Sequence, residues 1–161
     1  MSDTLNNSWG FNIGDDHYKS PAEVERRLVR AAGNNSNLLL NIGPYPNGEI
    51  DPQFVTRLRE VGEWLSKYGD SIYGTRGGPI HPGDWGVTTQ KDGKIYVHVL
   101  NWGAPLLALP PIAAKVAGAR LLLDDAEVDF TQNADGVIVK VPPAKKDEVD
   151  RVVVLTMGKG N

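Results

Sequence analysis

The spacing of the apolar residues changes once along this chain of 161 residues, and the change limits the folds it can adopt. Up to residue 76, apolar residues recur every three or four positions, as in helices, whereas from residue 80 on they alternate as in strands. A cluster of glycine and proline at residues 74–83 separates the two patterns, and such clusters mark boundaries. The sequence therefore predicts two domains, residues 1–76 and 80–161.

Two helices are predicted in the first half from the signals at their ends. Ser20-Pro21-Ala22-Glu23 is a capping box with proline at the first helical position, and Gly33 ends this helix. Asp51 is the predicted N-cap of the second helix, which ends near Gly69. The expected apolar faces are Val24, Leu28, Ala31 and Ala32 in the first helix, and Phe54, Leu58, Val61, Trp64 and Leu65 in the second.

A short apolar run, residues 37–44, lies between these helices. It reads Asn-Leu-Leu-Leu-Asn-Ile-Gly-Pro, without alternation and with turn residues at both ends. Such a run is typical of a strand buried on both faces in a parallel sheet flanked by helices. The first half is therefore predicted to be α/β.

The second half is predicted to be an antiparallel β-sandwich, because short alternating strands follow one another at close spacing. Asp92-Gly93 and Asp135-Gly136 mark hairpin turns. The predicted strands cover residues 87–90, 94–100, 115–123, 127–131, 136–141 and 151–157.

Composition excludes several classes of function. The net charge is −3 and no basic run is present, which argues against a nucleic-acid partner. There is no cysteine and no apolar stretch of about 18 residues, so disulfides, thiolate metal sites and a membrane span are not expected. Residues 1–10 do not form a signal peptide, which makes a cytoplasmic location the default expectation. His17, His81 and His98 are scattered and support neither a metal site nor a catalytic triad; His98 is expected to be a partly exposed strand residue.

Four blocks of the first half resemble, in order, segments of the α-L-fucosidases of glycoside hydrolase family 29. Residues 3–11, Asp-Thr-Leu-Asn-Asn-Ser-Trp-Gly-Phe, resemble the family's T-x-N-x-S-W-G-Y segment, with Phe11 where tyrosine is usual. Residues 37–50 resemble N-x-L-L-N-I-G-P-x-x-D-G-x-I, with Asn47 in place of aspartate, and residues 57–65 and 68–75 continue in register. Residues 80–161 match only loosely, as the family's C-terminal β-sandwich.

The resemblance implies a (β/α)₈-like catalytic barrel followed by that sandwich. It also implies retaining hydrolysis of terminal α-L-fucosyl linkages, without metal or organic cofactor, on fucosylated glycans or fucosides. A complete barrel takes roughly 250 residues, so the chain is expected to hold only the last strands and helices. In the family, the nucleophilic aspartate lies on an earlier strand and the acid/base glutamate of many members just before the segment that opens this chain. We therefore expect little or no activity from the chain alone.

Three carboxylates near the predicted strand ends, Asp15, Asp16 and Glu49, are weak candidates for catalysis. Retaining glycosidases need two carboxyl groups about 5–5.5 Å apart. Each candidate also has a structural explanation, because Asp15 and Asp16 fit a solvated turn and Glu49 fits a surface loop.

The candidates for substrate binding are Trp9, Phe11 and Asn41. By resemblance, the aromatic residue at position 9 lines the sugar pocket beside the methyl group of fucose, and Phe11 shares its face of an extended segment. Asn41 ends the predicted buried strand, where barrel enzymes place polar contacts. Core packing for the aromatic residues and a turn hydrogen bond for Asn41 are the alternatives. Trp85 and Trp102 could form a sugar-stacking platform, although packing within the sheet explains them as well.

Two further readings of the function stay open. The chain could be a non-catalytic carbohydrate-binding or structural module whose folding unit is the sandwich. It could also form a homo-oligomer, because a strand buried on both faces needs sheet neighbours that this chain supplies too sparsely. Copies of the chain would then complete the barrel and rebuild a sugar pocket.

Overall fold

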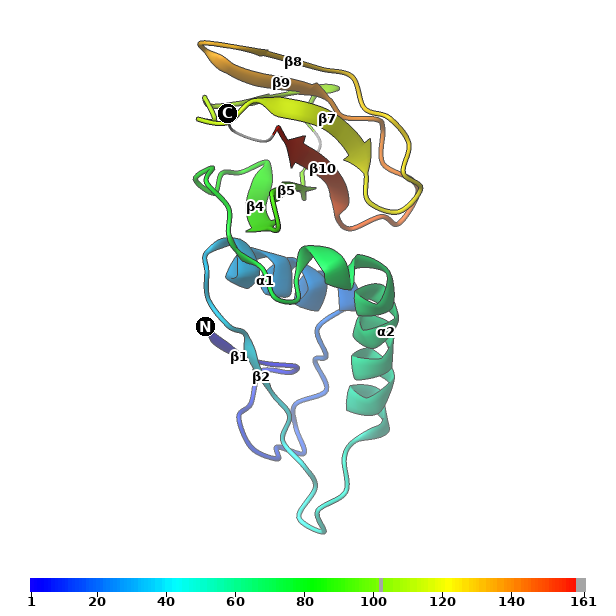
Figure 1. Cartoon of the computed structure of the whole chain (residues 1–161). Helices are drawn as coiled ribbons and strands as arrows, with labels where there is room; N and C mark the ends of the chain where they lie inside the picture. Colours follow the sequence, from blue (N-terminus) through cyan, green and yellow to red (C-terminus); the bar gives the residue numbers. More distant parts are fainter. Residues whose placement is uncertain (102, 159–161) are drawn as a thin grey trace.

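The computed structural model describes residues 1–101 and 103–158; Trp102, one of the two predicted platform residues, lies outside this part, as do residues 159–161. A five-stranded sheet forms the middle of the molecule, with a three-stranded sheet on one side and two helices on the other (Figure 1). A pair of short strands and two long loops lie beyond the helices, at the end remote from the sheets. No helix in the described part of the chain combines the length and apolarity needed to cross a membrane.

The five-stranded sheet is antiparallel, in the order β3-β4-β5-β10-β7. Its strands are β3 (Arg76–Gly77), β4 (Gly86–Lys91), β5 (Lys94–Val99), β10 (Arg151–Met157) and β7 (Val116–Leu121). The three-stranded sheet, also antiparallel, has the order β6-β9-β8, with β6 (Leu106–Leu109), β9 (Gly136–Lys140) and β8 (Phe130–Asn133). The hairpin turns predicted at Asp92-Gly93 and Asp135-Gly136 connect β4 to β5 and β8 to β9.

The two sheets share one hydrophobic core, and the alternation of β5 shows how it is made. Val97 faces the second sheet and contacts a cluster that includes Val137 and Val139 of β9. Tyr96, on the opposite face of the strand, joins a cluster with Trp64 and other residues of the helices. Because both faces of β5 are covered, every residue after Lys94 in this strand is buried. Trp85 packs against the core between the sheets, as its packing alternative predicted.

The two helices begin where the sequence predicts. Helix α1 (Pro21–Gly33) has the capping box of Ser20 and Glu23, and helix α2 (Pro52–Tyr68) begins at the N-cap Asp51. A short 3₁₀ turn, η1 (Gly69–Ser71), follows α2. The predicted faces are partly wrong: Leu58 is 40% exposed, whereas Glu25 and Val29 are buried in α1.

The apolar run between the helices forms a shorter and less buried strand than predicted. Strand β2 (Leu39–Asn41) pairs in parallel with β1 (Ser2–Thr4) in a sheet of two strands. Leu40 and Ile42 pack against the helices, but Leu39 on the other face is 60% exposed. The prediction of burial on both faces is therefore wrong for this chain, because no layer of the described residues covers the second face.

Other differences concern short strands. The sequence analysis missed β1, β3 and β6, and the strand predicted at residues 127–131 lies at β8, three residues later at its start. Each missed strand has two to four residues, which is too short to establish an alternating pattern.

Candidate functional site

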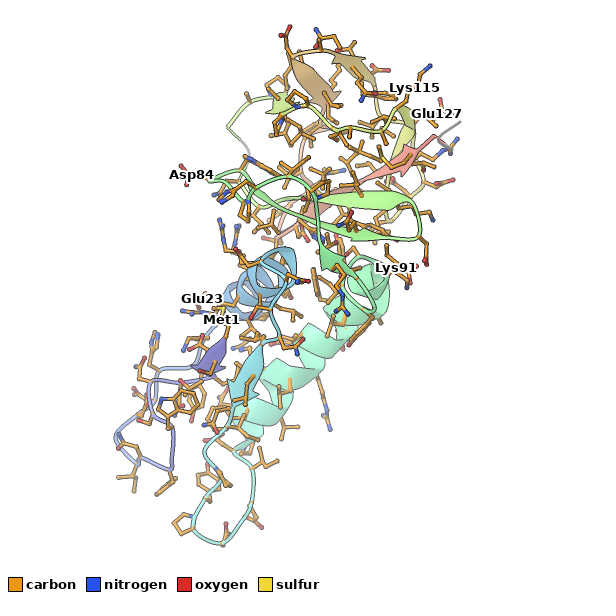
Figure 2. The ribbon with its side chains drawn as sticks, turned by 60° about the vertical axis from the view of Figure 1, so that its left-hand side comes forward. Met1, Glu23, Asp84, Lys91, Lys115 and Glu127 are labelled. Atoms are coloured by element: carbon orange, nitrogen blue, oxygen red, sulfur yellow. The ribbon has the colours of Figure 1, made fainter. Side chains whose placement is uncertain are left out.

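The candidate residues lie where the paired strands β1 and β2 end. Because these strands are parallel, their carboxyl ends meet at the same edge of the sheet. The loop of residues 5–20 follows β1 and the loop of residues 42–51 follows β2; both extend away from the two larger sheets (Figure 2). We call the contacts between these loops, made by Trp9, Phe11, Asn41, Gly43 and Tyr45, the strand-end cluster.

Asn41 and Trp9 are brought together, through the backbone of the tryptophan. The Asn41 side chain donates from Nδ2 to the Trp9 carbonyl oxygen over 2.7 Å. The Asn41 carbonyl oxygen accepts from the backbone N–H of Leu5 at 3.0 Å, which extends the pairing of the two strands by one residue. The side-chain amide therefore fixes the segment that carries Trp9, whose own side chain is 58% exposed.

Gly43 explains how closely the two loops approach. A Cβ atom at this position would lie 2.6 Å from the carbonyl carbon of Gly10 and 2.7 Å from its oxygen. Only glycine allows the backbone to pass here without displacing the segment between Trp9 and Phe11. The glycine of the Asn-Ile-Gly-Pro sequence is therefore required by the contact with the neighbouring loop.

Phe11 is tied to the second loop through Tyr45. Their ring centroids are 5.5 Å apart in an edge-to-face arrangement. The Tyr45 hydroxyl donates to Oδ2 of Asp51 at 2.9 Å, and the Tyr18 hydroxyl donates to the same oxygen at 2.7 Å. The hydrogen bonds of the two tyrosines to Asp51 were not predicted, because no spacing pattern relates residue 18 to residues 45 and 51.

Asp51 stays negatively charged, and Tyr18 and Tyr45 stay neutral, over a wide pH range. The Tyr18 hydroxyl and the backbone N–H of Gln53 lower the pKa of the Asp51 carboxyl below its usual value. Conversely, the hydrogen bond to Asp51 raises the pKa of Tyr18 to about 12 and also raises the pKa of Tyr45. Asp51 therefore remains an ionised acceptor that caps α2, as the sequence analysis predicted for this residue.

The three weak catalytic candidates have separate local contacts. Asp15 accepts from the backbone N–H of Asn7 at 3.0 Å, and a hydrogen bond from Ser8 lowers the pKa of its carboxyl. Glu49 accepts from the side chain of Asn47 at 2.9 Å in an exposed turn. Asp16 is exposed and directly follows Asp15.

His98 corrects one sequence expectation, because it is fully buried rather than partly exposed. Its Nδ1 lies 2.6 Å from Oδ2 of Asp150, and its Nε2 lies 3.2 Å from Oγ1 of Thr89. This order of groups matches a nucleophile triad. However, the Thr89 hydroxyl donates to the carbonyl oxygen of Ser71 at 2.6 Å, and all four residues have no exposed surface. The arrangement therefore links β4, β5 and the residue before β10 to the turn after α2, and it cannot meet a substrate.

No group of three or more metal-ligating side chains occurs among residues 1–101 and 103–158. The strand-end cluster instead offers an exposed indole, an edge of Phe11 and backbone groups. Exposed aromatic rings of this kind can make apolar and stacking contacts.

Comparison with known proteins gives the same family from sequence and from fold. The family model described as alpha-L-fucosidase matches residues 1–70. The alpha-L-fucosidase of Branchiostoma floridae is 36% identical over 154 residues, which cover 88% of this chain and 33% of that protein. The plasma alpha-L-fucosidase of Homo sapiens is 29% identical over 146 residues, covering 84% of this chain and 31% of its own length. The chain thus spans about a third of the length of the curated relatives it matches.

Solved structures extend the similarity to nearly the whole chain. Alpha-L-fucosidase isoenzyme 1 of Paenibacillus thiaminolyticus superimposes with a TM-score of 0.86 at 38% identity, covering 98% of this chain and 39% of the other. The Thermotoga maritima alpha-fucosidase in complex with fucose gives a TM-score of 0.80 at 27% identity, covering 96% of this chain and 39% of that one. The similarity in fold therefore includes the second half of the chain, whose sequence matches the family only loosely.

Proposed function

Since this chain belongs to the α-L-fucosidase family and spans about a third of a curated member, we propose that it forms part of a retaining glycoside hydrolase that removes terminal α-L-fucosyl residues. Its substrates would be fucosylated glycans or simple fucosides. In that enzyme, the chain would provide the residues on one side of the sugar pocket and the last part of the catalytic domain.

In this proposal, residues 1–76 are the last strands and helices of a (β/α)₈-like barrel, and residues 80–161 are its C-terminal β-sandwich. The order strand, loop, helix occurs twice in the first half, with parallel strands, as in such barrels. The exposed side chains of Leu39 and Leu58 support the same view. They would lie under neighbouring strands and helices in a closed barrel.

The observation that carries the proposal is the exposed position of Trp9 at the carboxyl ends of parallel strands. Active sites of barrel enzymes lie at this face. The indole would contact the methyl group of fucose, and Phe11 would extend the apolar wall beside it. Asn41 would act as a positioning residue, since its amide is already bound to the Trp9 carbonyl.

The reaction itself would need carboxylates from outside this chain. A retaining mechanism uses a nucleophile and an acid/base about 5–5.5 Å apart. Asp51 caps α2 and accepts from two tyrosines, whereas Asp15 and Glu49 serve local turns. We therefore propose that the isolated chain binds fucose weakly and does not hydrolyse fucosides.

The test combines a fucose titration, followed through the indole N–H resonances, with an assay on an aryl α-L-fucoside. We expect the Trp9 resonance to shift with fucose and no turnover above background. Trp9→Ala removes this resonance, so its fucose binding is measured by calorimetry and should be lost, whereas Trp85→Phe, a change in the packed region between the sheets, should leave binding intact. Turnover of about 1 s⁻¹ or more, as in ordinary enzymes, or binding that survives Trp9→Ala, would contradict the proposal.

Association between copies of the chain is a second proposal, favoured by the exposed face of β2. Leu39 is 60% exposed, and β1 and β2 form a sheet of only two strands. Copies could cover these faces and complete the pocket. Light scattering at micromolar concentration should then give more than the monomer mass, and Leu39→Lys should restore the monomer. A strict monomer before the substitution rules out this form of assembly.

A further inference from the structure

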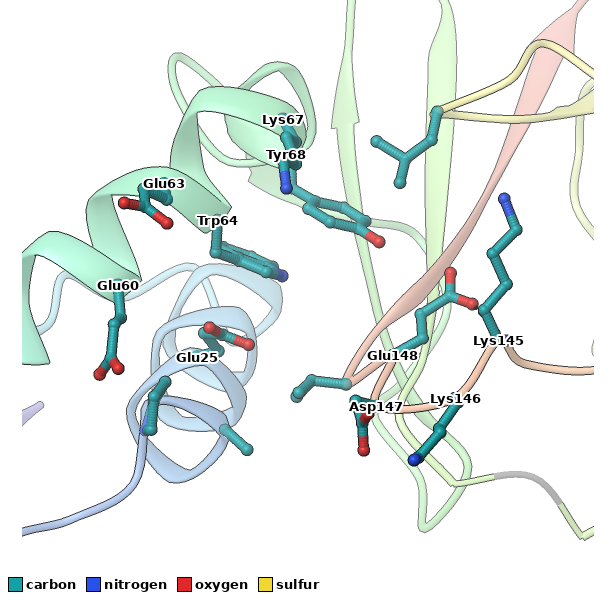
Figure 3. A pocket seen from close by; sticks show the side chains of 14 residues that line it. Glu25, Glu60, Glu63, Trp64, Lys67, Tyr68, Lys145, Lys146, Asp147 and Glu148 are labelled. Atoms are coloured by element: carbon teal, nitrogen blue, oxygen red, sulfur yellow. Dashed lines mark hydrogen bonds between the residues drawn. The ribbon is translucent and has the colours of Figure 1, made fainter.

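A cleft lies away from the strand-end cluster, where both helices meet the loop before β10 (Figure 3). It encloses about 460 Å³ and is lined by the first turns of α1, the second half of α2 and residues 145–149. This volume is within the range of small-molecule sites. Nothing in the proposed fucosidase function uses the cleft.

Glu25 is the unusual residue of this cleft. The residue is only 5% exposed, yet it lines the opening, and within the described part of the chain its carboxyl group receives no hydrogen bond and forms no ion pair. A largely buried carboxylate without a partner is unfavourable, because the part of its hydration that burial removes is not replaced. A ligand with a positive charge and N–H donors would replace the hydration that this carboxylate has lost.

The surroundings of Glu25 favour a cation. Burial, and then the negative charges of Asp150 and Glu60, raise the pKa of Glu25 to about 7, while Arg26 opposes this effect. One oxygen of Asp150 is buried without a partner. Five acidic and three basic side chains line the cleft. The basic side chains, Lys67, Lys145 and Lys146, are exposed, whereas Glu25 is buried.

An aromatic wall lies beside the carboxyl group. Trp64 stacks on Tyr68 with ring centroids 4.9 Å apart and an angle of 12° between the planes, and both residues line the cleft. Figure 3 shows the two rings on α2 above Glu25 of α1, with Glu148 on the opposite loop. Aromatic rings attract ammonium groups electrostatically. Glu148 already pairs with Arg151 at 3.0 Å and Glu60 with Arg57, and Glu63 and Asp147 are exposed to water. Glu25 is therefore the buried carboxyl group of the cleft without a partner among the described residues.

We propose that this cleft binds a small organic cation through a primary ammonium group, which pairs with Glu25 beside Trp64. A divalent metal is a poorer occupant, since no set of three metal-ligating side chains is found in residues 1–101 and 103–158. The ammonium group provides three donors on one charge. The alkyl part of the ligand would lie along Pro21, Ala22 and the aromatic rings.

The test is a titration of the whole chain with n-butylamine, followed by the Trp64 indole resonance and by calorimetry. n-Butanol and butyrate have the same alkyl chain without the positive charge. We expect saturable binding of butylamine and at least tenfold weaker binding of the other two. Because the carboxyl group must be ionised, butylamine should bind about tenfold more weakly at pH 6 than at pH 8.

Glu25→Gln keeps the size of the side chain and removes its charge, so butylamine affinity should fall at least tenfold while the thermal melt shows a folded protein. Glu63→Gln, an exposed residue of the same cleft, is the matched control and should change the affinity less than threefold. Nα-acetyllysine amide distinguishes the sources of the ammonium group. If it binds more tightly than butylamine, the ligand is a lysine of a polypeptide; if less tightly, it is a free amine.

Three results would overturn the proposal. The first is no saturable binding of either amine, and the second is equal binding of butanol or butyrate. The third is a Glu25→Gln variant that binds butylamine as the original chain does. None of these results bears on the fucose site, because the strand-end cluster and this cleft share no residues.

Discussion

The orientation of Trp9 depends on a single side-chain amide. Asn41→Ala removes the hydrogen bond to the Trp9 carbonyl, and we expect the free energy of unfolding to fall by about 0.5–1.5 kcal/mol. The Trp9 indole resonance should also shift and broaden, as the segment loses its anchor. Asn47→Ala is the matched control, because the Asn47 amide bonds only to exposed Glu49 in the described structure. An unchanged Trp9 resonance in Asn41→Ala would show that Asn41 does not position this residue.

Glu25 should make stability depend on pH. Its pKa is about 7 in the folded chain against an ordinary value of 4.5, so the folded state binds the proton more tightly than the unfolded state does. The stabilisation is complete below pH 4.5 and is lost as the pH rises through 7. Glu25→Gln should therefore gain stability over the original chain as the pH rises from 4.5 to 8. Urea unfolding at several pH values measures this, and parallel pH curves for the two proteins would refute it.

The buried pair of His98 and Asp150 is expected to be essential for stability. His98→Leu leaves the Asp150 carboxylate without its partner in a site that water does not reach. Removal of one member of a buried pair costs about 3–5 kcal/mol, which should appear in the free energy of urea unfolding. Asp150→Asn, which keeps an acceptor oxygen and the volume, should cost less. A loss below 1 kcal/mol in His98→Leu would mean that the pair contributes little.

Local roles of single residues were predictable from the sequence, whereas their partners from distant segments were not. Asp51 was predictable as a helix cap, because Pro52 follows it and an apolar stripe begins there. Its two tyrosine partners were not, since they come from separate loops that only the parallel pairing of β1 and β2 brings together. The burial of His98 and Glu25 was also not predictable from the sequence. Both depend on contacts between the helices and the sheets, which no local pattern encodes.

The approach of the two loops after β1 and β2 depends on Gly43. In Gly43→Ala, the new methyl group would overlap Gly10, and we expect a loss of about 1–3 kcal/mol in unfolding free energy together with a shifted Trp9 resonance. Gly62→Ala in α2 is the matched control, because a methyl group there meets no atom within 4 Å. That change should stabilise the chain by about 0.5–1 kcal/mol. A neutral effect of Gly43→Ala would show that the loops are not held closely.

Among the elements, helix ends and hairpin turns were the most predictable features. Ser20, Glu23 and Asp51 act through contacts within three residues, so the sequence contains all of the information. Strand β2 was predicted at the right place but with the wrong burial. Its apolar run is suited to a sheet with cover on both faces, and the described residues cover only one face.

For the whole molecule, the sequence predicted a division near residue 78 into an α/β half and a β half. It did not predict that the helices would pack on the sheet, although the cluster of Val29, Trp64 and Tyr96 joins the two halves. Strands β4, β5 and β10 are covered on both faces over most of their length for this reason. The proposed boundary thus separates two patterns of sequence, while the helices and the sheet share a core.

We propose that this chain provides the Trp9 side of a fucosidase pocket whose reactive carboxylates lie elsewhere. The most direct measurement replaces the matching part of the Paenibacillus thiaminolyticus enzyme, which superimposes with a TM-score of 0.86, with this chain. The rate of this chimera on an aryl α-L-fucoside is then compared with that of the chain alone. We predict an active chimera, a tenfold or greater loss with Trp9→Ala, and an inactive isolated chain. A folded chimera without activity, or hydrolysis by the isolated chain, would contradict the account.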